Sequence, residues 1–377
     1  MTKPPREGHL HQLLLYETSQ DLRAVVVPML RRGLAAGEAV VLACGQANTE
    51  LLARELAVAP SDRPAAGRLT VLNADDGGRP AVAVDLLRRL TRAYSAAEHG
   101  RILLVRETDL GAGLGAGPGR YAAAVEFEAA ADVALAAEPL TSLCLYHRPN
   151  LPASLLTEVE HAHPRLLSAT GSDGNPGYRS PATLLRRHAT PGLDPLQTTP
   201  ALYQHPPLTS LSEVSRLRRD LQDLIGTLPV PMATRNDFIA AVGEVTVNGL
   251  QHGRLPVRVL IWASADRLLA TVTDAGRGFD DPLAGYLAPG EDLSGGAGLW
   301  LARLLCDRVE AVRAHESFTI RLATSLPASN GRPALNGVRA RTEHARRRAQ
   351  RARQRAEQLQ GELDLLIGDF WRHPPRP

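Results

Sequence analysis

The feature that most constrains the fold is a regular alternation of short apolar runs with longer amphipathic segments over residues 11–165. The apolar runs lack a clean polar alternation, which is typical of strands covered by helices on both faces. Strand–helix–strand order of this kind predicts a doubly wound, parallel α/β sheet. The expected strands span 11–16, 39–43, 69–72, 101–106 and 142–146, and the expected helices span 21–32, 48–56, 81–97, 120–137 and 153–160.

A second unit is expected over residues 209–325, where two or three helices would cover a mixed sheet as an α/β sandwich. Its expected helices span 211–224, 234–252 and 298–306, and its expected strands span 257–262, 268–273, 309–313 and 318–322. Between the units, residues 167–208 are rich in proline, glycine, serine and threonine and are expected to be a linker. A chain of 377 residues has room for two such domains.

Residues 326–377 are expected to be a loop followed by a basic helix that resembles a coiled coil, because small and apolar residues recur there in steps of four and three. Arginines occupy the first half of this segment. Such a helix favours a homodimer, an acidic partner or packing on its own protein. Nucleic acid is not an expected partner, because this segment has no aromatic stacking residue before Phe370.

The basic residues exclude several enzyme classes, because Lys3 is the only lysine of the chain. Walker A loops, eukaryotic-type protein kinases and Schiff-base enzymes all need a lysine in the folded site. A nucleotide would have to be held by backbone amides, arginine or metal. The three cysteines are too few for a disulfide framework, and no run of apolar residues is long enough to span a membrane; both observations favour a cytoplasmic protein.

Two motifs in the second unit carry side chains suited to nucleotide chemistry. Glu244 and Asn248 are four residues apart on an expected helix, so a potential general base and a potential Mg²⁺ ligand share one face. Asp274 follows an expected strand and could accept from an adenine amino group, while Gly276 and Gly278 would allow close approach of the backbone. Taken singly, the first motif also fits a solvated helix face and the second a plain β-turn.

A third motif, Gly295-Gly296-Ala-Gly298, precedes an expected helix, whose free amides can bind phosphate without a lysine; a hinge is the alternative. The order and spacing of the three motifs over residues 209–323 resemble the GHKL, or Bergerat, ATP-binding fold, and in particular the bacterial anti-sigma-factor serine kinases. The resemblance implies roles for the following residues: Glu244 as catalytic base, Asn248 as Mg²⁺ ligand, Asp274 as adenine acceptor, Gly276 and Gly278 in the base pocket, and Gly295, Gly296 and Gly298 along the phosphate lid.

Three departures from the family pattern are visible. Ser317-Phe318 stands where a Gly-Thr pair is usual, and Gly249 stands where alanine is usual. The lid segment, residues 280–293, carries four carboxylates, which beside a triphosphate would require metal or an outward orientation.

The resemblance implies a cytoplasmic signalling protein that uses ATP and Mg²⁺. The expected activity is phosphorylation of a serine or threonine on an anti-anti-sigma partner, together with sequestration of a sigma factor. Two alternatives remain: a nucleotide-gated binding module without phosphotransfer, and a protein resembling sensor histidine kinases.

Polar residues of the first unit carry a second resemblance, to the MEDS sensory domain, over residues 9–166. The matching features are the candidates for a sensory pocket at the strand ends: His11, Tyr16, Glu107, Glu128, Tyr146 and His163. The resemblance implies a RecA-like sheet without a working P-loop that binds a small molecule. A scaffold that only docks a partner is the alternative. The pairs His9/His11 and His161/His163 could also converge with Cys144 or Glu107 on a metal ion.

Overall fold

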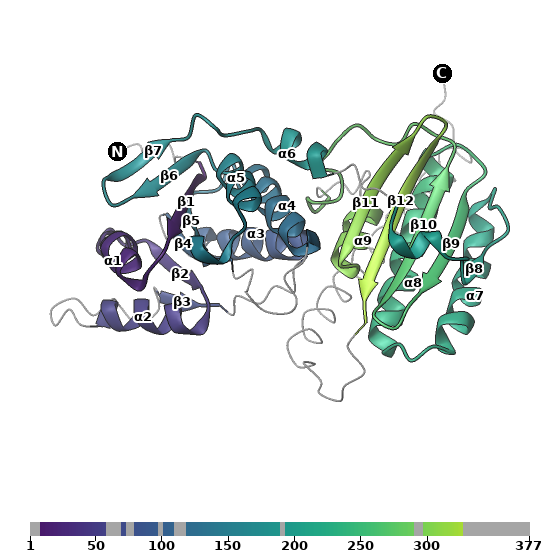
Figure 1. Cartoon of the computed structure of the whole chain (residues 1–377), viewed down its shortest axis with the longest axis horizontal. Helices are drawn as coiled ribbons and strands as arrows, with labels where there is room; N and C mark the ends of the chain where they lie inside the picture. Colours follow the sequence, from purple (N-terminus) through teal and green to yellow (C-terminus); the bar gives the residue numbers. More distant parts are fainter. Residues whose placement is uncertain are drawn as a thin grey trace, which may run out of the picture. The chain divides into compact units, whose positions relative to one another are not determined.

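The computed structural model describes residues 8–57, 69–72, 79–96, 101–108, 118–188, 193–289 and 297–326, and contains two separate sheets (Figure 1). The first has seven strands in the order β3-β2-β4-β5-β1-β6-β7, and the second has five in the order β11-β12-β10-β9-β8. The α/β class expected from the sequence is confirmed for both. Among the described helices, none combines the length and the apolar character needed to cross a membrane.

The first sheet is parallel from β3 to β6, and only β7 at its edge runs antiparallel. Its strands are β1 (Leu10–Tyr16), β2 (Ala39–Ala43), β3 (Leu69–Val71), β4 (Ile102–Glu107), β5 (Leu140–His147), β6 (Arg165–Ser168) and β7 (Gly171–Gly174). Its helices are α1 (Ser19–Ala35), α2 (Gln46–Ala57), α3 (Pro80–Ala96), α4 (Pro118–Ala134), α5 (Ala153–Ala162) and α6 (Pro181–His188).

Both faces of this sheet are covered, as the uninterrupted apolar strands predict. Side chains of α1 and α2 pack with Leu14, Leu42 and Leu145 in one core. Side chains of α3, α4 and α5 pack with Leu13 and Cys144 in the other. Successive residues of β1 therefore enter opposite cores, since side chains alternate along a strand.

The segment 167–208 is not the plain linker that its composition predicts. Its described part contains β7, α6 and β8 (Tyr203–Gln204), with the one-turn 3-10 helix η2 (Pro195–Thr198) between the last two. Leu184 and Leu185 of α6 are buried in the same core as α4. Composition failed here because β7 pairs with β6, and β8 with β9, through backbone hydrogen bonds that need no particular side chains.

The second unit is a sheet with helices packed on it (Figure 1). The pairings β8–β9 and β9–β10 are antiparallel, so the sheet is antiparallel there rather than mixed. Its elements are α7 (Val214–Gly226), α8 (Met232–His252), β9 (Arg258–Ala263), β10 (Arg267–Asp274), α9 (Ala297–Leu305), β11 (Arg308–Ala314) and β12 (Ser317–Ser325). The helix α8 packs on α7, on α9 and on β10, which places it at the centre of the unit. The expected basic helix lies outside the described residues.

Candidate functional site

The C-terminal half of α8 presents the expected acid–amide pair, and the helix packs closely on its neighbours at several glycines. A Cβ atom at Gly298, in the first turn of α9, would lie 2.9 Å from Oδ1 of Asn248. The glycine motif and the Asn248 carboxamide are therefore in contact, although fifty residues of sequence separate them. Gly295 and Gly296 lie outside the described residues.

Asp274, at the end of β10, is brought to the C-terminal end of the same helix. Its Oδ1 accepts from the backbone amides of Gly276 (2.7 Å) and Arg254 (3.1 Å). A Cβ at Gly253 or at Gly276 would come within 2.6 Å of that oxygen. Both of the hydrogen bonds described for this carboxylate go to Oδ1, which leaves Oδ2 as the atom that could accept from an adenine amino group.

Glu244 lies one turn before Asn248 on α8 and has a partner that sequence reasoning missed. Arg218 of α7 places Nη2 3.3 Å from Oε1 of Glu244. The arginine also lies over Gly243, where a Cβ would lie 2.5 Å from its Nε. No local pattern predicts this pair, since the two residues are 26 positions apart and belong to different helices.

The departures from the family pattern have local reasons. Gly278 has φ +68°, and a Cβ there would meet the ring of Phe318 at 2.2 Å. The phenylalanine thus covers a turn that only glycine can make. A Cβ at Gly249 would lie 3.2 Å from Val257, so glycine lets the strand region approach α8 closely. In the lid, Asp280 is exposed and pairs with Arg313 at 2.9 Å, while residues 290–293 lie outside the described residues.

The candidate residues of the first unit do not form one pocket. Tyr16 and Glu107 line a cavity of about 470 Å³ at the carboxyl ends of β1, β2, β4 and β5, together with Asn48 and His147. His11, Glu128, Tyr146 and His163 are fully buried on the α4 side of the sheet and do not line this cavity. The separation follows from strand parity: positions 11 and 16 of β1 differ by an odd number and face opposite sides.

The cavity is organised around the Glu107 carboxylate. Asn48 donates to its Oε1 at 2.7 Å, the backbone amide of Gly45 donates to its Oε2 at 2.9 Å, and the Tyr16 hydroxyl donates to Oε1. Burial, reinforced by Glu107, raises the pKa of Tyr16 well above its usual range. Because the carboxylates of Glu17 and Glu107 line the cavity, it is better suited to a small polar or cationic molecule than to phosphate.

Comparisons with known families agree with this division. Residues 10–164 match the model of MEDS, the methanogen/methylotroph DcmR sensory domain, and residues 209–324 match the histidine kinase-like ATPase domain. The chain thus contains a MEDS domain followed by a histidine kinase-like ATPase domain. The second domain implies ATP as its ligand.

No curated protein matches the sequence. Among solved structures, the chain is similar to the crystal structure of the RsbU and RsbW domains of a Mycobacterium tuberculosis protein. The two are 18% identical over 34% of each chain, with a TM-score of 0.26. The match therefore spans about a third of that relative.

Proposed function

We propose that the ATPase domain binds Mg²⁺-ATP and transfers its γ-phosphoryl group to a serine or threonine of a protein partner, under the control of the MEDS domain. The observation that carries the proposal is the meeting of three distant segments around α8. Gly298 packs against Asn248, and Gly253 and Gly276 enclose the Asp274 carboxylate. Close backbone approach at two neighbouring places along the C-terminal half of α8 is what a nucleotide with its base at one place and its phosphates at the other requires.

The residues present fit the metal that such a site uses. The Asn248 carboxamide supplies a hard oxygen donor beside the start of α9, and Mg²⁺ held there would neutralise the phosphate charge. Asp274 would receive the adenine amino group on Oδ2. Gly298 would leave room for the phosphates at the first turn of α9.

Glu244 is the group we assign as general base. Its carboxylate would take the proton of the acceptor hydroxyl while that oxygen forms a bond to the γ-phosphorus and the bond to the β–γ bridging oxygen breaks, releasing ADP. Arg218 of α7 forms an ion pair with this carboxylate. When the acceptor hydroxyl binds, the arginine would have to release one carboxylate oxygen so that this oxygen can accept the proton.

The partner is proposed from the resemblance of the motifs to anti-sigma-factor kinases: an anti-anti-sigma protein as the phosphate acceptor and a sigma factor as the protein that is sequestered. For the MEDS domain, we place its small-molecule ligand in the cavity around Glu107, because the cavity lies at the carboxyl ends of parallel strands, where ligands of open α/β sheets bind. Ligand binding there would alter the activity of the ATPase domain.

The Arg218–Glu244 ion pair favours a second candidate function, a nucleotide-gated binding module that performs no transfer. A carboxylate neutralised by an arginine is a poor general base. In this version, nucleotide occupancy alone would determine whether the partner is captured.

The two candidates differ in whether label from γ-labelled ATP reaches the partner. The full chain would be incubated with this ATP, Mg²⁺ and a purified anti-anti-sigma protein. Acid-stable label on the partner supports transfer to serine or threonine, whereas acid-labile label would indicate phosphohistidine. Nucleotide binding without label would identify the binding module.

A substitution at Glu244 tests whether this residue is the general base. Glu244→Ala should abolish transfer while Mg²⁺-ATP still binds in calorimetry. Asp223→Ala, which removes an exposed carboxylate of α7, serves as the matched control and should transfer normally. Transfer that persists in Glu244→Ala would show that another group is the base.

A further inference from the structure

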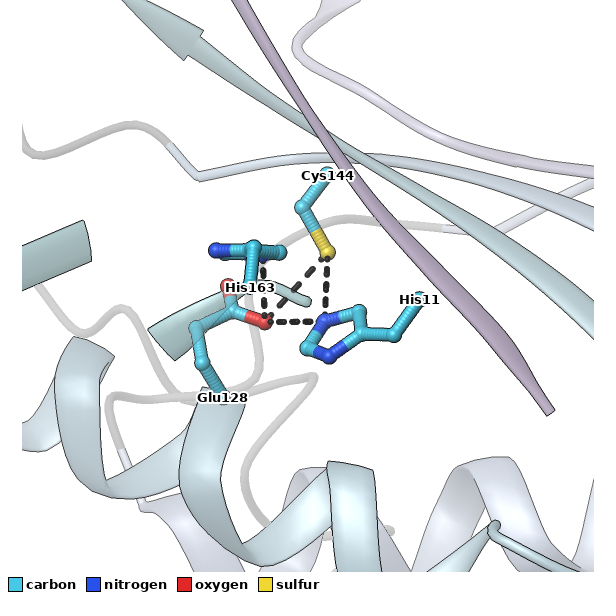
Figure 2. A group of neighbouring side chains, drawn as sticks. All are labelled: His11, Glu128, Cys144 and His163. Atoms are coloured by element: carbon cyan, nitrogen blue, oxygen red, sulfur yellow. Dashed lines mark hydrogen bonds and ion pairs between the residues drawn. The ribbon is translucent and has the colours of Figure 1, made fainter. Parts of the chain in front are cut away.

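Four side chains with metal-binding atoms converge inside the MEDS domain, away from the cavity (Figure 2). His11 lies on β1, Cys144 on β5, Glu128 on α4, and His163 directly after α5. All four are at most 2% exposed. One nitrogen, sulfur or oxygen atom from each lies within 4.8 Å of the others, so the four could contact a single ion.

Four separations in the cluster are close to the edges of a tetrahedral site, and the shortest of them, between His11 and Glu128, lies slightly below that range. His11 Nε2 is 3.5 Å from Cys144 Sγ, and Glu128 Oε2 is 3.1 Å from His11 Nε2 and 3.3 Å from Cys144 Sγ. His163 Nε2 is 3.5 Å from Glu128 Oε2. Zinc-to-ligand distances of about 2.0–2.3 Å in a tetrahedron give ligand-to-ligand distances of roughly 3.3–3.8 Å.

Neighbouring groups orient three of these side chains. His163 Nδ1 donates to the Val159 carbonyl at 2.8 Å, so Nε2 faces the cluster. Asp132 Oδ1 lies 3.3 Å from His11 Nδ1. The Tyr146 hydroxyl donates to Glu128 Oε1 at 2.7 Å, so Oε2 faces the cluster. Carboxylates and carbonyls on the outer nitrogens of histidines are the usual second layer of metal sites.

Two buried ring nitrogens of these side chains, His11 Nδ1 and His163 Nε2, have no hydrogen-bond partner of normal geometry in the described structure. His163 Nε2 is buried and makes no hydrogen bond of normal geometry. In the neutral ring, with the proton on Nδ1, its lone pair faces the Glu128 carboxylate. Two acceptors directed at each other in a dry interior need a cation or a proton between them.

The charges of the cluster balance when a divalent metal ion is bound. A divalent ion with one thiolate, one carboxylate and two neutral imidazoles carries no net charge. Arg106, 3.6 Å from Glu128, is balanced by Asp132 beside His11. With protons alone, a single imidazolium ring and this arginine would balance the same two carboxylates, so the donor atoms and their geometry, rather than charge, select the metal ion.

We propose that His11, Glu128, Cys144 and His163 bind one Zn²⁺ ion. Thiolate and imidazole donors select zinc over Mg²⁺ or Ca²⁺, which prefer oxygen. Because the protein supplies all four ligands and none is exposed, the site is closed. The ion would link β1, β5, α4 and the residue that follows α5, within the same domain as the cavity around Glu107.

The test uses the full chain, purified without a polyhistidine tag and in the presence of Zn²⁺. Elemental analysis should find one zinc per chain. Replacement by Co²⁺ should give intense visible bands of tetrahedral cobalt and a near-ultraviolet band from thiolate to cobalt. Chelation should lower the Tm, and added Zn²⁺ should restore it.

Variants assign the ligands. Cys144→Ser, nearly the same size as the native residue, should remove the thiolate band and most of the zinc. Cys44→Ser, at another buried thiol of the same domain, should retain both, because Cys44 contacts the Val105 carbonyl and no ligand of the cluster. His163→Gln should also lose zinc.

The proposal is overturned if the wild-type chain takes up only substoichiometric zinc and shows no thiolate band with Co²⁺. It is equally overturned if Cys44→Ser loses the band while Cys144→Ser keeps it. Should Cys144→Ser fail to fold, the wild-type cobalt spectrum alone decides, since it reports thiolate ligation directly. A zinc-free, folded chain would mean that the cluster is a protonated ion-pair network.

Discussion

Gly298→Ala should separate the stability of the ATPase domain from its affinity for nucleotide. The new methyl group would lie 2.9 Å from Oδ1 and 3.0 Å from Nδ2 of Asn248. A short side chain can relieve this contact by rotating its carboxamide, at a cost of about 0.5–1.5 kcal/mol. Alanine also favours a helix over glycine by about 1 kcal/mol. The two effects nearly cancel, so we expect the free energy of unfolding to change by less than about 1 kcal/mol.

Binding of Mg²⁺-ATP should respond much more strongly. A rotated carboxamide no longer presents its oxygen where the proposed site needs it for Mg²⁺. Losing one interaction with a charged group costs about 1.5–3 kcal/mol. This corresponds to a Kd about ten- to a hundredfold weaker.

Calorimetric titration of the full chain with Mg²⁺-ATP measures the affinity, and thermal unfolding without nucleotide measures the stability. Gly174→Ala is the matched control, because a Cβ there meets nothing within 4 Å. An unchanged Kd in a folded Gly298→Ala variant would refute the placement of Mg²⁺-ATP beside the Asn248 carboxamide. A large drop in Tm would instead refute the argument that this contact is relieved locally.

Two further predictions concern segments outside the nucleotide site. Leu184→Ala should lower the free energy of unfolding by about 2–5 kcal/mol in urea titrations, because Leu184 is fully buried beside α4. Leu193→Ala changes an exposed position and should have no effect. Equal stability of the two variants would contradict the packing of α6. Tyr203 donates to Asp220 at 2.8 Å, and burial together with that carboxylate raises the pKa of Tyr203 to about 12. Because the pKa is raised in the folded protein, the hydrogen bond stabilises the protein fully below pH 10, and this stabilisation is lost as the pH rises through 12. Tyr203→Phe should therefore be less stable than wild type by about 0.5–1.5 kcal/mol at neutral pH and equally stable above pH 12. A stability difference that does not depend on pH would contradict this prediction.

Most of the secondary structure of both units could be predicted from the sequence. The strand expected at 39–43 is Ala39–Ala43, and the helix expected at 234–252 is Met232–His252. These elements follow from local hydrophobic periodicity and from the positions of glycine and proline, which act over a few residues. The composition of residues 167–208 was misleading for the same reason: a local signal does not report that Leu184 has a partner on α4.

Some details of the sites were available in local spacing and were missed. Asp132 is four residues after Glu128, so both side chains lie on one face of α4 and reach His11. The odd separation of His11 and Tyr16 already places them on opposite faces of the sheet. The alternation of side chains along a strand therefore already argued against a single sensory pocket that contains both residues.

By itself, the sequence determined the order of most elements and the two domain types, and it offers a single lysine, Lys3, to any site. Only the tertiary structure decided which distant side chains meet: Arg218 with Glu244, Gly298 with Asn248, and Cys144 with His163. The physical reason is that secondary structure depends on backbone hydrogen bonds between near neighbours, whereas a site depends on packing between elements that are far apart in the chain.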